Sequence, residues 1–559
     1  MILAGDGHHD TSVRLCPPVS TTASRARIGG DVVVESLRAL GCETAFGVPG
    51  VHALSIWEGL RDSPIRVYGA RTELCAGFAA DGHARSSGRP APLLLSTGPG
   101  ALNSLTALME AASAHVPVVA ISSQIPRLML GRGRGFLHEL DDQLASFAPI
   151  VKHATRAESA ESIPHQLERA WAIAQTPPSG PVYLEIPVDV LAGEVPGAPV
   201  GELDASIPRR AAGEAECAQA ARLLANAERP VIWAGGGVLR AGARDELRAL
   251  AERLDAPVAT TYMGKGAITE DHPLSAGSGC DEAAFQELLA GADVVLCVGT
   301  ELGAETTGQY GLRFGGHVIQ IDAAAERIGA SYPALALVGD AKLTLRALAD
   351  ELPPRRDPDV AERILALRAR VRAGLEQQGR ATELGLLAVI EGALPDDAIG
   401  CWDMTILAYW AAPHLRLRGE QQFLYPLGSG TLGYAWPAAI GAAVAHPQRP
   451  VLGIVGDGGV HYALAELATA AQYGIGAKLL LVDDGGYGIL REYQRDTYGG
   501  TVSVDLHQPD FVALAQAFGV PSRGGSAEDA AALLEWAFAQ PGPAVAVLRA
   551  TLVAARPTT

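Results

Sequence analysis

Short apolar runs that alternate with helical stretches constrain the fold of this chain more than any other feature. From about Gly29, each run ends in Gly, Ser, Thr or Asp and precedes an Ala-, Leu- and Glu-rich stretch of helical period. Runs that are apolar on both faces are typical of buried parallel strands. The alternation predicts an α/β fold of doubly wound, mainly parallel sheets. The clearest predicted strands lie at 92–96, 116–122, 182–187, 231–234, 294–299, 317–322, 451–456 and 478–483.

Two breaks in composition divide the 559 residues into three predicted domains. One break is rich in Gly, Pro and charge, and the other begins with Pro353-Pro354-Arg355-Arg356 and continues as an Arg- and Glu-rich helix. We therefore expect a mobile N-terminal extension at 1–27, domains at 28–190, 212–351 and 380–555, a linker at 191–211 and a linker helix at 352–379.

Charge and cysteine usage exclude several classes of protein. The chain has 44 Lys and Arg against 62 Asp and Glu, a net charge of −18, which argues against nucleic acid or an anionic membrane as a partner. No CxxC pair occurs, and seven scattered cysteines fit a reducing cytoplasm. We find no secretory signal and no apolar stretch of about 18 residues, so we expect a cytoplasmic protein with no membrane span.

Acidic residues follow two neighbouring predicted strands. Gly456-Asp457-Gly458 ends the strand at 451–456, a helix is predicted at 462–473, and Asp483-Asp484 ends the strand at 478–483. The carboxyl ends of adjacent parallel strands meet at one crevice, so Asp457 and Asp484 can converge. Two carboxylates and a backbone carbonyl suit a Mg²⁺ ion that bridges a diphosphate, which glycines and a helix N-terminus can approach closely.

The spacing of these acids resembles the thiamine-diphosphate motif. From about residue 28 to 550 the chain is similar to the acetolactate synthase and 2-oxo acid decarboxylase superfamily, because further segments match that family in order. The resemblance implies that the first domain binds the pyrimidine and the third the diphosphate, each from a different subunit, so that a homodimer is the minimum unit and a tetramer is plausible. The matching segments are 47–50, 71–73, 79–85, 97–100, 180–187 and 430–439.

The resemblance also assigns roles to residues that would contact the cofactor. Glu73 matches the cofactor-activating glutamate, and a carboxyl whose pKa is raised by burial can share a proton with the pyrimidine ring nitrogen. Leu432 matches the apolar wedge that folds the cofactor, and Gly430 would offer its carbonyl to the cofactor's amino group. Asp457, Asp484 and the Gly486 carbonyl would hold Mg²⁺, and Gly456 and Gly458 belong to the same diphosphate cradle.

Two segments depart from the family pattern. Asp483-Asp484 replaces the usual two asparagines, and a second anionic ligand binds Mg²⁺ more strongly but repels the diphosphate. We expect binding to survive with a changed metal preference, and two solvated aspartates at a strand end are the alternative. In the central domain, Gly299-Thr300-Glu301-Leu302-Gly303-Ala304-Glu305-Thr306 stands near the place of the family's flavin signature, which makes FAD doubtful.

Histidines and tyrosines are the candidate substrate residues. His138 follows the glycine-rich stretch 131–135, where decarboxylases of the superfamily carry a histidine pair, and it could orient the substrate carboxylate or deliver a proton. A histidine that only stabilises the loop is the alternative. His52 and His115 are weaker candidates, and Tyr487 and Tyr493 are predicted to line the substrate mouth unless they only begin a surface helix.

The sequence therefore predicts decarboxylation of a small 2-oxo acid with thiamine diphosphate and Mg²⁺, after which the enamine is protonated to an aldehyde or ligated to a second carbonyl compound. Segments 50–52, 137–139 and 403–405 resemble the 5-guanidino-2-oxopentanoate decarboxylase branch. Two alternatives stay open. One is an acetolactate-synthase-type carboligase that forms a 2-hydroxy-3-oxo acid or acyloin, and the other is an inactive cofactor-binding homologue.

Overall fold

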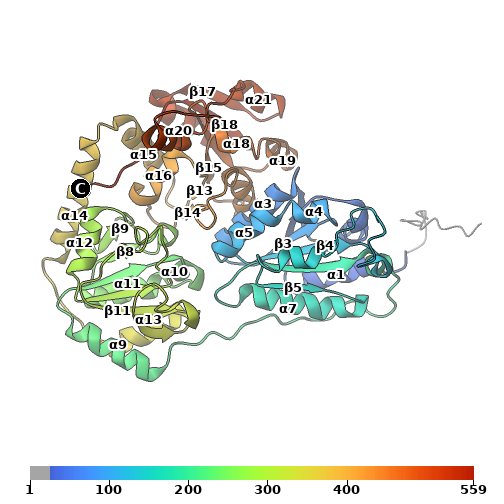
Figure 1. Ribbon diagram of the computed structural model, residues 1–559, viewed down its shortest axis with the longest axis horizontal. Coiled ribbons are helices and arrows are strands. Elements are labelled where there is room, and N and C mark those ends of the chain that lie inside the picture. The colour runs from blue at the N-terminus through green and yellow to red at the C-terminus, as the bar shows by residue number, and fades with distance from the viewer. Residues whose placement is uncertain (1–24, 559) are drawn as a thin grey trace, which may run out of the picture.

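Three parallel six-stranded sheets with interleaved helices make up the computed structural model, which describes residues 25–558 (Figure 1). The α/β fold predicted from the apolar runs is thereby confirmed. Most of the predicted extension at 1–27 lies outside the described residues. No helix among the described residues has the length and apolar character needed to cross a membrane.

The N-terminal sheet has the strand order β2-β1-β3-β4-β6-β5. Its strands are β1 (Thr44–Gly47), β2 (Arg66–Gly69), β3 (Ala91–Leu95), β4 (Val118–Gln124), β5 (His153–Arg156) and β6 (Val182–Pro187). Its helices are α1 (Gly29–Ala39), α2 (Leu54–Leu60), α3 (Glu73–Ser87), α4 (Pro99–Leu102), α5 (Leu105–Ser113), α6 (Gln143–Phe147), α7 (Ile163–Gln175) and α8 (Val188–Ala192).

The central sheet has the order β12-β11-β10-β7-β8-β9. Its strands are β7 (Pro230–Ala234), β8 (Val258–Thr260), β9 (Ser275–Gly277), β10 (Val294–Val298), β11 (His317–Asp322) and β12 (Leu335–Val338). Its helices are α9 (Glu214–Asn226), α10 (Gly236–Ala241), α11 (Arg244–Leu254), α12 (Ala283–Gly291) and α13 (Ala341–Glu351), and α14 (Val360–Gln377) leads into the last sheet.

The C-terminal sheet has the order β14-β13-β15-β16-β18-β17. Its strands are β13 (Ile399–Trp402), β14 (Gln422–Leu424), β15 (Val451–Gly456), β16 (Lys478–Asp483), β17 (Ser522–Ser526) and β18 (Ala544–Arg549). Its helices are α15 (Ala381–Ala393), α16 (Ile406–His414), α17 (Ala435–Ala445), α18 (Asp457–Val460), α19 (Glu466–Tyr473), α20 (Gly488–Tyr498), α21 (Phe511–Ala517) and α22 (Ala530–Phe538).

Strand β15 shows why these runs fold as buried strands. Val451 and Val455 belong to the apolar cluster on one face of the C-terminal sheet, whereas Leu452 and Ile454 belong to the cluster on the other. Successive side chains of a strand point to opposite faces, so a run that is apolar at every position is covered by helices on both sides.

The helix predicted at 462–473 begins later, at Glu466. Residues 461–465 form turns, because the Glu466 amide bonds the Ala463 carbonyl at 3.0 Å and the Tyr462 carbonyl faces the Cys75 Sγ at 3.6 Å. The segment after β15 thus folds as a short helix, a turn and a second helix.

Helices α3 and α17 join the N-terminal and C-terminal sheets at close range. A Cβ on Gly82 would lie 2.2 Å from the Ala438 carbonyl oxygen, and one on Gly441 would lie 1.9 Å from that of Ala79. Only glycine at both positions lets the two backbones approach this closely. The contact fixes α3, which begins at Glu73, against the helix that follows Leu432.

Candidate active site

Three adjacent strands of the C-terminal sheet each lead into a segment that carries an aspartate at their carboxyl ends. Asp403, Asp457 and Asp484 follow β13, β15 and β16, which are neighbours in the sheet. Asp457 is 1% exposed, and its carboxyl lies close enough to that of Asp484 for each to affect the pKa of the other. Burial raises the pKa of Asp484 to about 7, with a further contribution from the Asp457 carboxylate, and burial also raises the pKa of Asp457. The structure thus brings together the two aspartates predicted to converge.

The Asp457 and Asp484 pair fits a divalent cation. Asp457 Oδ2 and Asp484 Oδ1 are buried and have no hydrogen-bond partner among the described residues. Two neighbouring carboxylates without a compensating charge are unfavourable, and a cation between them would remove the repulsion. No group of three or more His, Cys, Asp or Glu that could hold a metal occurs within residues 25–558. One or two carboxylates are the usual protein share of a Mg²⁺ site, where waters and phosphate oxygens complete the set.

The glycines around these acids are required by close packing. A Cβ on Gly458 would lie 2.6 Å from the Tyr487 ring and 3.4 Å from the Gly486 carbonyl oxygen, which places this carbonyl beside the segment that carries Asp457. A Cβ on Gly456 would lie 3.0 Å from Thr405 Oγ1. The predicted residues Gly458, Gly486 and Tyr487 therefore pack together, and Gly456 packs against Thr405.

Asp403 is a site residue that the sequence reasoning did not assign. Its buried carboxylate accepts hydrogen bonds from the backbone amides of Met404 (2.9 Å), Gly433 (3.2 Å) and Ala435 (3.1 Å). Burial raises its pKa to about 6. These bonds hold one end of the loop that carries Gly430 and Leu432. The sequence feature that could have indicated Asp403 is its position directly after a strand, because Asp457 has the same kind of position.

A buried ionic network that includes Asp81 and Arg85 of segment 79–85 contacts both ends of this loop. Arg85 pairs with Asp81 at 2.9 Å, and the Tyr434 hydroxyl donates to Asp81 at 2.7 Å. Glu110 accepts hydrogen bonds from the amide and hydroxyl of Ser429, both at 2.8 Å. Gly430 and Leu432 lie between these anchors; Gly430 is exposed with φ +67°, and Leu432 is half-buried.

Glu73 begins α3 and is half-buried. Thr72 caps this helix by accepting a hydrogen bond from the Cys75 amide at 3.2 Å. The Asn103 amide donates to Glu73 Oε2 at 3.2 Å, and a Cβ on Gly100 would lie 3.2 Å from Glu73 Oε1. Glu73 therefore lies against the turn of segment 97–100.

Glu466, on α19, is a second residue whose role the sequence did not predict. It is 1% exposed and accepts hydrogen bonds from the amides of Arg71 (2.9 Å) and Thr72 (3.3 Å) and from the Thr469 hydroxyl (2.6 Å). Burial raises its pKa. Glu466 thereby ties the start of α3 to the helix that follows the Asp457 segment. The only sequence feature that could have indicated Glu466 is its position between Asp457 and the pair Asp483-Asp484.

His52 and His138 come together although 86 positions separate them. Their ring centroids are 5.1 Å apart in an edge-to-face arrangement, and His52 is fully buried. Both ring nitrogens of His52 and the Nδ1 of His138 have no partner among the described residues. Burial lowers the pKa of His52. A Cβ on Gly98 would meet the His138 carbonyl oxygen at 2.8 Å, so His138 and Glu73 flank the same turn.

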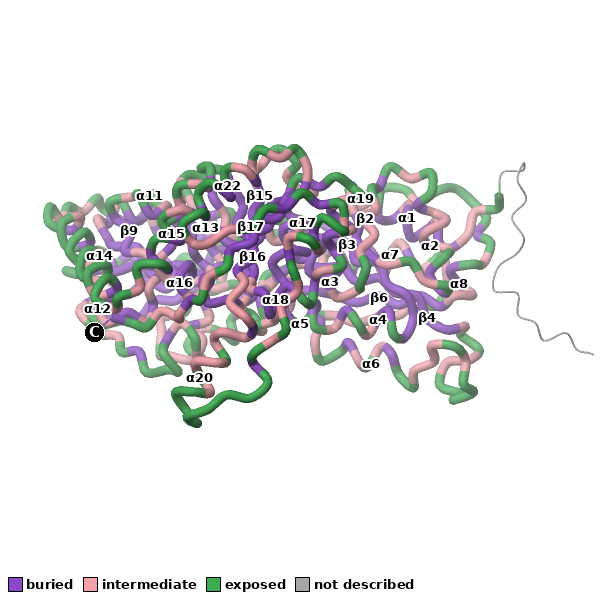
Figure 2. Tube along the Cα trace, turned by 90° about the horizontal axis from the view of Figure 1, so that it is seen from above, coloured by how far each residue is buried: buried purple, intermediate pink, exposed green. Residues whose placement is uncertain are grey.

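The remaining predicted substrate residues lie elsewhere. Among the described residues, no ring contact or hydrogen bond joins His115 to His52 or to His138. The Nε2 of His115 instead lies 2.8 Å from a carboxylate oxygen of Glu301 in the central unit. This pair lines a cavity of about 710 Å³ between the N-terminal and central sheets. Tyr493 is 55% exposed on α20, a helix with no buried residue that projects from one edge of the molecule (Figure 2).

Comparison with known proteins agrees with this architecture. Models of the thiamine pyrophosphate enzyme family match the chain in three parts: the N-terminal TPP binding domain at 27–146, the central domain at 217–348 and the C-terminal TPP binding domain at 403–548. The chain therefore belongs to the thiamine pyrophosphate enzyme family, which confirms the resemblance found in the sequence.

Individual relatives cover nearly the whole chain. A probable 2-ketoarginine decarboxylase, AruI, of Pseudomonas aeruginosa is 40% identical over 88% of this chain and 89% of its own length. A probable acetolactate synthase large subunit of Methanocaldococcus jannaschii is 34% identical, with 88% and 86% covered. The acetolactate synthase large subunit IlvB1 of Mycobacterium tuberculosis is 33% identical, with 88% and 82% covered. These relatives confirm an enzyme of the decarboxylase or carboligase type.

Proposed function

We propose that the chain is a thiamine-diphosphate- and Mg²⁺-dependent decarboxylase of a small 2-oxo acid that releases an aldehyde. The observation that carries this proposal is the turn of segment 97–100, where Gly98 lies against His138 and Gly100 lies against Glu73. The backbone and Cβ of His138 make the contact with Gly98, so the proposal also requires the His138 ring to turn toward the cofactor, where a proton donor would favour protonation of the product over ligation to a second carbonyl compound.

Asp457, Asp484 and the Gly486 carbonyl would hold Mg²⁺, and the loop anchored by Asp403 would present the Gly430 carbonyl and the Leu432 side chain to the cofactor. Thiamine diphosphate, when bound there, would supply the carbanion chemistry and the electron sink that decarboxylation of a 2-oxo acid requires. Glu73 would hold and release a proton at Oε1, because its Oε2 accepts a hydrogen bond from Asn103.

The two histidines would act on the substrate side. Because burial lowers the pKa of His52, its ring is neutral at pH 7 and adds no charge that would hold the substrate carboxylate in place. The Nδ1 of His138 is buried and has no partner among the described residues, and in this proposal it would be the donor of the proton to the product carbon. The ring of His52 packs against His138 and Phe136 and would keep water from this side of the site.

The first substrate to test is 5-guanidino-2-oxopentanoate. Its support is the relative named as a probable 2-ketoarginine decarboxylase, together with segments 50–52, 137–139 and 403–405. Carboligation is the second candidate and is favoured by the relatives named as acetolactate synthases. FAD remains doubtful for both candidates, because segment 299–306 lacks the flavin signature.

The assembly we propose is a homodimer or homotetramer in the cytoplasm, in which domain 28–190 of one subunit and domain 380–555 of another form each site. Among the described residues, no hydrogen bond joins Glu73 to Asp457 or Asp484, and the hydrogen-bond donor to Glu73, Asn103, belongs to the N-terminal unit. The six described cysteines are free thiols, which suits a reducing compartment.

Product analysis separates the candidates. The purified chain would be incubated with thiamine diphosphate, Mg²⁺ and, in turn, pyruvate, 2-oxobutanoate and 5-guanidino-2-oxopentanoate. Carbon dioxide with an equal amount of aldehyde supports the decarboxylase. Acetolactate or another acyloin as the main product overturns it in favour of the carboligase. Cofactor binding without carbon dioxide release from any of these acids supports the inactive homologue.

A further inference from the structure

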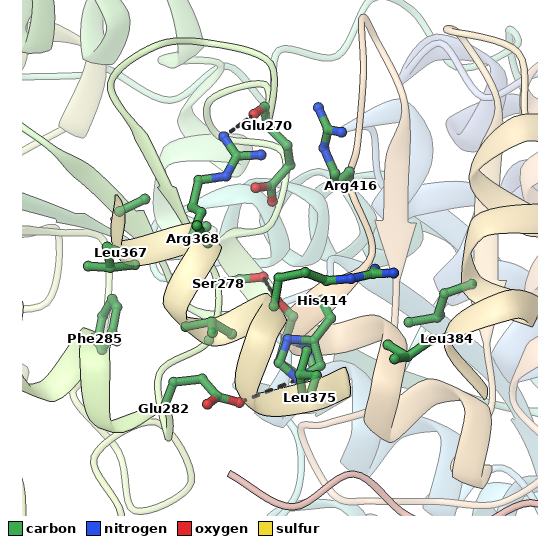
Figure 3. A pocket seen from close by; sticks show the side chains of 18 of the residues that line it. Glu270, Ser278, Glu282, Phe285, Leu367, Arg368, Leu375, Leu384, His414 and Arg416 are labelled. Carbon is green, nitrogen blue, oxygen red and sulfur yellow. Dashed lines mark hydrogen bonds and ion pairs between the residues drawn. The ribbon is translucent and has the colours of Figure 1, made fainter. Parts of the chain in front are cut away.

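A second cavity, of about 640 Å³, lies between the central unit, α14 and the C-terminal unit (Figure 3). Its lining includes none of the residues assigned to the cofactor site. Glu270 and Ser278 come from the central unit, Arg368 from α14, Glu391 from α15 and His414 from the end of α16. A pocket of this size at the junction of several units is typical of a small-molecule site.

One side of the cavity is apolar. Figure 3 shows Phe285, Leu367, Leu375 and Leu384 around its lower half, below the charged side chains of Glu270, Arg368 and Arg416; Glu282 is the acidic side chain labelled in this half, and it pairs with His414 at 3.4 Å. His414 also lies in this part, and because burial lowers its pKa to about 3 it is neutral at pH 7. This wall suits an apolar chain of several carbon atoms.

Charges of both signs line the rest of the cavity. The lining holds four carboxylates and three guanidinium groups, and Lys265 lies behind Glu270 at 3.4 Å. Two of the guanidinium groups have carboxylate partners, since Arg416 pairs with Asp271 at 2.5 Å and Arg372 with Glu376 at 2.7 Å. The near balance of charge disfavours a ligand that carries only one charge.

The charged side chains of the cavity that lack a partner indicate which charges a ligand would carry. Arg368 forms no ion pair among the described residues and donates only to the Glu270 backbone carbonyl, at 2.8 Å. Glu270 is 5% exposed and uses one carboxylate oxygen toward Lys265; Glu391 uses one oxygen for the Arg416 amide at 2.7 Å. Within residues 25–558 the second oxygen of each carboxylate accepts no hydrogen bond. The cavity thus offers a free cation, free anionic oxygens and an apolar wall.

We propose that this cavity binds the zwitterion of an α-amino acid with an apolar side chain. Its carboxylate pairs with Arg368, its ammonium group with the free oxygens of Glu270 and Glu391, and its side chain with Phe285, Leu375 and Leu384. A ligand with one charge leaves the opposite group of the cavity unpaired, which is unfavourable in a partly buried site.

Calorimetry on the full chain, without thiamine diphosphate or substrate, tests this site independently of the proposed decarboxylation. L-Leucine and L-phenylalanine are compared with 4-methylpentanoate, which lacks the amino group, and 3-methylbutylamine, which lacks the carboxylate. We expect at least one amino acid to bind with a Kd at or below about 1 mM and both single-charge analogues at least about tenfold more weakly. No heat from either amino acid, or an analogue that binds as tightly, overturns the proposal.

Substitutions of a positive and of a negative side chain that line the cavity test whether the amino acid binds there. Arg368→Gln and Glu391→Gln each remove one charge, and each is expected to weaken amino acid binding at least about tenfold. Arg370→Gln is the matched control on α14, since Arg370 pairs with Glu287 on the exposed surface at 2.6 Å outside the cavity. Because Arg368 also holds the Glu270 backbone, Glu391→Gln decides the outcome if Arg368→Gln does not fold. Binding unchanged in Glu391→Gln overturns the proposal.

Discussion

At the scale of single residues, Glu73 makes the sharpest prediction. Under the proposed function its carboxyl moves a proton, so Glu73→Gln should lower the rate of carbon dioxide release by about 10²–10⁴-fold. Binding of thiamine diphosphate should change only a few-fold, because the substituted amide keeps its size and its contact with Asn103. Steady-state assays and calorimetry measure the two effects. Glu58→Gln, on the surface helix α2, is the control, and full activity in Glu73→Gln would contradict the assignment.

The raised pKa of Asp484 predicts how the free energy of unfolding depends on pH. Its folded pKa of about 7 lies above its ordinary value of 3.8, so between these pH values the folded chain holds a proton that the unfolded chain has released. Stability of the metal-free chain should therefore fall as pH rises from 4 to 7. Asp484→Asn removes this loss and should stabilise the metal-free chain at pH 8 by about 1–2 kcal/mol.

Magnesium supplies the control for the Asp484 prediction. Because the ion binds the ionised carboxylates, Mg²⁺ should raise the melting temperature of the parent chain more at pH 8 than at pH 5. Thermal unfolding at both pH values, with and without Mg²⁺, measures this. Two results would show that the pKa of Asp484 is not raised in the folded chain. One is a parent chain whose metal-free stability does not change between pH 4 and 7, and the other is a variant that is no more stable at pH 8.

At the scale of elements, the start of α3 is set by one side chain. Thr72→Ala removes the hydrogen bond to the Cys75 amide and should lower the free energy of unfolding by about 1 kcal/mol. Because Glu73 is the next residue, thiamine diphosphate should also bind more weakly. Urea titrations and calorimetry measure the two effects. Thr72→Ser keeps a hydroxyl acceptor and should retain both properties; equal losses in the two variants would argue against capping.

The elements themselves were largely predictable. Each predicted strand lies within two residues of an observed one, because runs such as 451–456 are apolar on both faces and end in turn residues. The helix predicted at 462–473 was placed too early, because a contact between Tyr462 and Cys75 on a helix far away in sequence replaces its first turn. Local pattern fixes a strand, whereas tertiary contacts decide where a helix begins.

At the scale of the whole molecule, the sequence predicted which acids follow strands but not what surrounds them. Asp457 and Asp484 could be paired in advance because parallel strands share a carboxyl edge. The contact between His52 and His138 depends on how distant segments of the N-terminal unit pack, and the hydrogen bonds that Glu466 accepts from the amides before α3 depend on how the N-terminal and C-terminal units pack. Periodicity within one segment carries no information about such packing, so these partners required the structure.

The proposed assembly makes a prediction that involves two chains. If Glu73 of one subunit and Asp457 of another serve the same site, a heterodimer of Glu73→Gln and Asp457→Ala chains has one intact site and should retain about half of the parent activity. A heterodimer that pairs a parent chain with a chain carrying both substitutions should have no intact site and no activity. Co-expression with two affinity tags isolates each heterodimer for the carbon dioxide assay. Sites built within a single chain would exchange the two results, because the first heterodimer would then be inactive and the second half-active.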